Sequence, residues 1–113
     1  MRNFIILIIF ILPLISMAQL QTENLNFDNN NREYLIYTPD NYSNNNPTPI
    51  LFALHGGAGY AVDFMNYEAD FRPISDTSNF ILIYPQALED PETGYTSWMH
   101  KEPTEHDDIY FIE

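Results

Sequence analysis

The chain has 113 residues, which is enough for one small domain or for part of a larger one. Sixteen acidic residues against four basic ones give a formal net charge of −12, which argues against binding to nucleic acid or to anionic lipid. There is no cysteine, so disulfides, thiolate nucleophiles and thiolate metal sites are excluded.

The first residues predict a secretory signal peptide. Arg2 precedes an apolar run from Phe4 to Ile15 that contains a single proline, and the small residues Ser16 and Ala18 match a cleavage site. The run is shorter than the ~20 apolar residues that a membrane-spanning helix needs. We expect residues 1–18 to be removed, with no stable membrane anchor left, and the mature chain to be secreted or periplasmic.

The mature chain begins with a predicted antiparallel hairpin. The segments Thr22 to Asp28 and Arg32 to Thr38 have the alternating and aromatic-rich composition of strands. Three asparagines at 29–31 lie between them and favour a tight turn, because asparagine tolerates the left-handed conformation. Pro39 ends the second strand, and the asparagine- and proline-rich loop at 40–49 should be exposed.

The segment from Ile50 to Tyr60 carries the strongest chemical signal. Ile50 to Leu54 are all apolar, which predicts a strand covered on both faces, as in a parallel sheet. His55 ends this strand, and a turn with three glycines follows, at Gly56, Gly57 and Gly59. Glycine allows positive φ and a close approach to bare backbone, so we expect main-chain N–H groups here that can donate to an oxyanion.

The next part of the chain predicts a strand-helix-strand unit. Residues 61–78 carry apolar side chains at roughly helical spacing and favour one or two short helices. We expect Pro73 in the first turn of the second helix, with Asp70 as a cap, because proline is tolerated there. The apolar run from Phe80 to Tyr84, closed by Pro85, predicts a second parallel strand. In the isolated segment, we expect this run to be an unpaired sheet edge.

The last part of the sequence predicts a loop and then a helix. Residues 86–103 have no periodicity, and loops of this length are often functional. Residues 104–107 match a capping box, with Ile109 and Ile112 expected to face inward. No stop signal precedes Glu113, so we expect the chain to be cut within this helix.

A metal site is the alternative for the polar residues of this region, which are His100, Glu102, Glu105, His106, Asp107 and Asp108. Their spacing is irregular, and the neighbours His106 and Asp107 would diverge by about 100° on a helix. We expect no metal and no cofactor.

In their order, these motifs resemble the start of the secreted polyhydroxybutyrate depolymerase and feruloyl esterase-like branch of the α/β-hydrolases. The matching pieces are the signal peptide, Arg32-Glu33-Tyr34 through Tyr37 to Pro39, Pro49 and the strand into Leu54-His55-Gly56, Phe80 to Pro85, Trp98, and Asp107-Asp108-Ile109 with Phe111-Ile112. The resemblance implies the N-terminal portion of an α/β-hydrolase catalytic domain over residues 19–113. In that portion an antiparallel hairpin leads into a mostly parallel sheet with flanking helices.

The same resemblance implies a secreted serine esterase or depolymerase that hydrolyses carboxylic esters, and it leaves open whether the substrate is a polymeric ester, a polysaccharide-linked ester or another ester. The loop after the third strand of such enzymes supplies an oxyanion-hole N–H, which points to Gly57, with Gly56 beside it. His55 is then expected to support the loop, and not to react. Trp98 has two open roles, near the substrate or in the core.

The catalytic serine of this fold lies in a Gly-x-Ser-x-Gly elbow, followed by the acid and the histidine. No serine of the chain has these flanking glycines, so we expect no catalytic residue here and no activity of the chain alone. The elbow serine is expected roughly 15 to 25 residues past Glu113, from typical helix, loop and strand lengths. The alternative is a complete, small, acidic, secreted binding module without catalysis.

Overall fold

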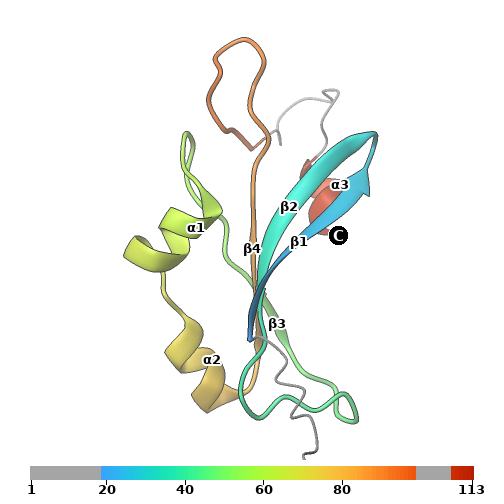
Figure 1. Ribbon diagram of the computed structural model, residues 1–113, viewed down its shortest axis with the longest axis vertical. Helices are drawn as coiled ribbons and strands as arrows, with labels where there is room; N and C mark the ends of the chain where they lie inside the picture. The colour runs from blue at the N-terminus through green and yellow to red at the C-terminus, as the bar shows by residue number, and fades with distance from the viewer. Residues whose placement is uncertain (1–18, 99–107) are drawn as a thin grey trace, which may run out of the picture.

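The computed structural model describes residues 19–98 and 108–113, which form a mixed α/β domain with one four-stranded sheet and a few short helices (Figure 1). The strands are β1 (Leu20–Phe27), β2 (Asn30–Tyr37), β3 (Ile50–Phe52) and β4 (Ile81–Pro85). The helices are α1 (Ala61–Asp63), the π-helix η1 (Phe64–Glu68), α2 (Arg72–Ser78) and α3 (Asp108–Ile112). The expected signal peptide and capping box lie outside the described residues.

The strand order in the sheet is β1-β2-β4-β3. β1 pairs antiparallel with β2, β2 pairs antiparallel with β4, and β3 pairs parallel with β4. The chain leaves β3 and passes through α1, η1 and α2 before it enters β4, as the strand-helix-strand pattern predicted. The α/β class is therefore confirmed, but the described sheet is mixed, with one parallel pairing.

The hairpin turn between β1 and β2 is shorter than expected and lies nearer the N-terminus. Phe27 pairs with Asn30, so the connection has only two residues, Asp28 and Asn29. Their φ angles are 49° and 59°, as a type I′ turn requires. Asn31, which was expected in the turn, belongs to β2 instead.

The prediction that Ile50 to Leu54 are covered on both faces is wrong. β3 is an edge strand, and the side chains of Ile50, Leu51 and Phe52 are 53%, 40% and 38% exposed. The expected unpaired run at Phe80 to Tyr84 is instead the inner strand β4, in which Leu82 is fully buried. An apolar run predicts burial only if both neighbours are present, and β3 has one in the described part of the chain.

The core lies on one face of the sheet, beneath α1, η1 and α2, while α3 lies on the other side (Figure 1). The core side chains are Leu35, Tyr37, Ala53, Ala61, Met65, Leu82 and Tyr84.

Pro73 is in the first turn of α2, as predicted. The expectation that Asp70 caps α2 is wrong, because the N-cap residue is Phe71, although the Asp70 Oδ1 accepts the N–H of Arg72 at 3.1 Å. No helix in the described segments is long and apolar enough to cross a membrane.

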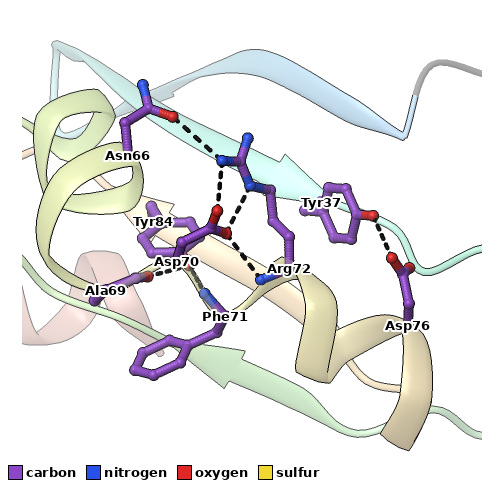
Figure 2. Close-up of polar contacts among 8 residues, drawn as sticks. All are labelled: Tyr37, Asn66, Ala69, Asp70, Phe71, Arg72, Asp76 and Tyr84. Atoms are coloured by element: carbon purple, nitrogen blue, oxygen red, sulfur yellow. Dashed lines mark hydrogen bonds and ion pairs between the residues drawn. The ribbon is translucent and has the colours of Figure 1, made fainter.

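Two buried tyrosines fasten the helical crossover to the sheet (Figure 2). The Tyr84 hydroxyl donates to the carbonyl of Ala69 at 2.7 Å and accepts the N–H of Phe71 at 3.2 Å. The Tyr37 hydroxyl donates to Oδ2 of Asp76 in α2 at 2.9 Å. Each bond joins a polar group of the crossover to β2 or β4, so the segment between β3 and β4 is attached to the sheet at Tyr37 and at Tyr84.

The Tyr37 contact predicts a loss of stability in alkaline solution. Burial, followed by the hydrogen bond to Asp76, raises the pKa of Tyr37 from 10.0 to about 12. The folded state therefore holds this proton more tightly than the unfolded state, and the resulting stability is complete below pH 10 and lost between pH 10 and about 12. Urea unfolding across this pH range should show a smaller decline in the free energy of unfolding for Tyr37→Phe than for the wild type.

The exposed Tyr67 provides the matched control, because Tyr67→Phe should leave the wild-type pH profile unchanged. An equally steep alkaline decline in Tyr37→Phe would contradict the assignment.

Helix α3 is attached to the sheet by a buried ion pair. The Nη2 of Arg32 in β2 donates to Oδ1 of Asp108, and these residues are 1% and 5% exposed. The Arg32 guanidinium also lies 3.9 Å from the ring centre of Phe111. The expectation that Ile109 faces inward is wrong, since it is 50% exposed and Asp108 is the buried residue. A helical apolar pattern cannot reveal that the Asp108 carboxylate forms an ion pair with an arginine 76 positions earlier in the sequence.

Candidate functional site

The candidate site is the loop that leaves the carboxyl end of β3 and enters α1. Gly56 and Gly57 are exposed, and a Cβ built on either would meet nothing within 4 Å. In open α/β sheets, ligands approach at the carboxyl ends of the parallel strands. The backbone of this loop is therefore accessible from solvent at the end of the sheet where ligands usually bind.

His55 is buried beneath this loop, with 3% of its surface exposed, and both ring nitrogens are engaged. Nε2 lies 3.1 Å from the backbone N–H of Ala87, which can only donate, so Nε2 is the acceptor. The proton is therefore on Nδ1, which donates to the carbonyl of Gly56 at 2.7 Å. With both nitrogens occupied in this way, His55 supports the loop and is not placed as a general base.

The bond from His55 also fixes the direction of a backbone donor. The carbonyl of Gly56 and the N–H of Gly57 belong to one planar trans peptide and point in opposite directions. Because His55 Nδ1 holds the carbonyl, the Gly57 N–H is directed away from the histidine ring. This N–H makes no hydrogen bond within the described residues.

Trp98 holds the preceding peptide in the same way. Its indole Nε1 donates to the carbonyl of His55 at 2.7 Å, and the two rings lie 5.1 Å apart with an interplanar angle of 41°. The N–H of Gly56 shares that peptide with the His55 carbonyl and so points away from the indole N–H. Trp98 is half-buried and lies against the loop, and its contact with His55 gives it a supporting role that the sequence did not indicate.

The positive φ expected of the three glycines falls instead on Ala58, at 58°. The N–H of Gly59 bonds the carbonyl of Gly56 at 3.2 Å, which closes a turn with Ala58 as its third residue. An alanine in the left-handed region costs about 1–2 kcal/mol, and its N–H is held by the carbonyl of Thr96 at 2.7 Å. A side chain at position 59 would be tightly packed, because a Cβ on Gly59 would lie 3.0 Å from the Gly56 oxygen.

The loop after β4 supplies partners that sequence reasoning missed. Thr96 Oγ1 donates to the carbonyl of Gly59 at 2.6 Å, and Thr96 pairs with Glu89 in a short antiparallel bridge. Gln86 Oε1 accepts the N–H of Ala61 at 2.8 Å, and its Nε2 lies 3.1 Å from His55 Nε2. Neither residue belongs to a periodic or recognisable motif, so nothing in the sequence distinguishes it from other loop residues.

An apolar cavity of about 540 Å³ lies next to this support. It is lined by Leu54, Trp98, Asp108, Ile109, Ile112 and Glu113. Leu54 directly precedes His55, so the cavity adjoins the residues that carry and hold the loop. Its apolar walls would accept a hydrocarbon part of a ligand in preference to a charged one.

No group of three potential metal-ligating side chains occurs among residues 19–98 and 108–113. Of the donor set considered from the sequence, Asp108 is paired with Arg32, and His100, Glu102, Glu105, His106 and Asp107 lie outside the described residues. The site therefore consists of backbone donors and the side chains that hold them.

Comparison with known proteins assigns no family: no family model matches the chain, and no curated protein matches it.

Proposed function

We propose that this chain supplies the oxyanion hole of a secreted serine esterase that hydrolyses carboxylic ester bonds. The observation that carries the proposal is the pair of successive peptides held from below by Trp98 and His55. They leave the N–H groups of Gly56 and Gly57 without an acceptor in the described residues. Donors that are fixed before the reaction stabilise a developing oxyanion without any reorganisation, which makes them effective in catalysis.

The proposed reaction is an acyl transfer to a serine followed by hydrolysis. A serine hydroxyl attacks the ester carbonyl and gives its proton to a histidine, and the carbonyl oxygen becomes an oxyanion that accepts the Gly57 N–H. The tetrahedral intermediate then collapses, the alcohol leaves with the proton from the histidine, and water hydrolyses the acyl-enzyme by the same two steps. In this proposal the serine, the acid and the catalytic histidine are encoded beyond Glu113, and His55 takes no part in proton transfer.

The substrate class and location follow the same proposal. An ester with an apolar acyl chain suits the cavity lined by Leu54 and Trp98. The polymeric or polysaccharide-linked esters implied by the family resemblance lie outside the cell, which agrees with an export signal over residues 1–18. The net charge of −12 is compatible with such uncharged substrates.

The experiment that tests the proposal is serine capture on the product of the complete gene. The protein should hydrolyse p-nitrophenyl butyrate and should be labelled by a fluorophosphonate at a serine in a Gly-x-Ser-x-Gly motif. We expect that serine roughly 15 to 25 residues past Glu113. Replacing it with alanine should abolish both signals without lowering the melting temperature.

Residues 19–113 expressed alone should give no hydrolysis above a denatured control, because they lack the groups that form an acyl-enzyme. A complete gene product with no such serine would overturn the esterase proposal and favour an acidic binding module.

A further inference from the structure

Gln86 directly follows β4 and connects three parts of the site. Its Oε1 accepts the N–H of Ala61 at the start of α1 at 2.8 Å. Its Nε2 lies 3.1 Å from both the Ala87 carbonyl and His55 Nε2. Because the Ala61 N–H can only donate and the Ala87 carbonyl can only accept, the orientation of the Gln86 amide is determined. Gln86 therefore presents an N–H to the histidine ring.

We propose that Gln86 is a positioning residue that selects the tautomer of His55 and so aims the Gly57 N–H. Two donors, the Gln86 amide and the Ala87 N–H, face Nε2 and favour a bare nitrogen there. The ring proton is then required on Nδ1, where it holds the Gly56 carbonyl and sets the Gly56–Gly57 peptide plane. The importance of this arrangement for catalysis rests on the proposed function, whereas the selection of the tautomer does not.

Gln86→Glu separates this role from simple packing. Glutamate has the same length and still offers an oxygen to the Ala61 N–H, but its carboxylate can donate neither to His55 nor to the Ala87 carbonyl. A carboxylate oxygen about 3 Å from Nε2 should favour the neutral tautomer in which the ring proton has moved from Nδ1 to Nε2, which deprives the Ala87 N–H of its acceptor and leaves a lone pair facing the Gly56 carbonyl. The support of the Gly56 carbonyl is weakened as a result. Gln21→Glu in β1, which β2 separates from β4 in the sheet, is the matched control.

The direct measurement is nitrogen NMR of the complete gene product labelled with ¹⁵N-histidine. Long-range proton–nitrogen spectra report which ring nitrogen carries the proton, and the His55 signals are identified by their loss in His55→Gln. We expect the proton on Nδ1 alone in the wild type and in Gln21→Glu, and on Nε2 alone in Gln86→Glu, since a ring protonated on both nitrogens would still hold the Gly56 carbonyl. A wild-type His55 protonated on Nε2 would overturn the proposal, even if Gln86→Glu did not fold.

The kinetic measurement tests the consequence for turnover. Gln86→Glu should lower kcat on p-nitrophenyl butyrate by about 10-fold or more with little change in KM, because a misplaced oxyanion donor acts on the transition state. Thermal unfolding of both glutamate variants should show that the loss does not come from a smaller folded fraction. A proton on Nε2 with unchanged kcat would overturn the positioning role, as would an unchanged tautomer.

The two proposals fail in different ways. A wild-type protein without esterase activity would count against the proposed function, while the NMR spectra would still show whether Gln86 selects the His55 tautomer. An active esterase in which Gln86→Glu changes neither the spectra nor kcat would retain the function and refute the inference about Gln86.

Discussion

Replacing Gly57 with proline should lower the turnover of the proposed esterase by about 10²- to 10³-fold, the range measured when one oxyanion-hole donor is removed. Proline has no backbone N–H, so the substitution deletes the one group that His55 directs away from itself by holding the Gly56 carbonyl. The loss should appear in kcat, because the donor acts on charge that develops in the transition state. Steady-state kinetics of the complete gene product on a p-nitrophenyl ester measure it.

Gly57→Ala is the matched control for the proline variant. Alanine keeps the N–H, and its Cβ would meet no atom within 4 Å. Gly57 also does not have a positive φ, so the backbone conformation does not forbid a side chain. We expect near wild-type turnover for Gly57→Ala and similar melting temperatures for both variants. Equal losses in both would show that the loop needs space and not a donor, and full activity of Gly57→Pro would exclude Gly57 as the donor.

Arg32→Met should destabilise the fold by about 3–5 kcal/mol, the range for breaking a buried ion pair by removing one partner. The substitution leaves the Asp108 carboxylate buried without its guanidinium, and it also removes the stacking of that group on Phe111. Chemical denaturation monitored by circular dichroism measures the change in the free energy of unfolding.

The double variant Arg32→Met/Asp108→Leu identifies the cause of this loss. Replacing both charges with apolar groups removes the buried unpaired charge, so the double variant should be more stable than Arg32→Met alone. The exposed Asp70–Arg72 pair is the control, since Asp70→Ala should cost at most about 1 kcal/mol. An Arg32→Met variant as stable as Asp70→Ala would show that the Arg32–Asp108 pair does not hold α3.

Local sequence patterns predicted the elements of this fold well. The hairpin, the short helices of the crossover and the parallel strand at residues 81–85 depend on alternation, helical spacing and proline position, which are properties of adjacent residues. The pattern did not reveal the edge position of β3, because an apolar run reads the same whether a second neighbour is present or not. The positive φ at Ala58 was missed for a similar reason, since its N–H is held by Thr96 from another loop.

The candidate site shows the same limit, because its contiguous motif was visible in the sequence and its contacts between distant residues were not. The glycine loop was visible because an apolar strand that ends in His-Gly-Gly is a contiguous signal. The side chains that orient this loop are 31 and 43 positions from His55 in the sequence, at Gln86 and Trp98. Their roles depend on the distances that folding creates, so a single sequence could suggest the donors but could not identify their supports.

The separation of Arg32 and Asp108 also implies an order of events during folding. The β1–β2 hairpin is a local structure that can form in microseconds, whereas closing a loop of 76 positions costs about 4 kcal/mol of chain entropy. Until Asp108 is available, burying the Arg32 guanidinium would leave an unpaired charge away from water. The end of the hairpin that carries Arg32 therefore stays hydrated. We therefore expect α3 to dock late in folding, and the Arg32 end of the hairpin to become buried only after Asp108 has been added to the growing chain.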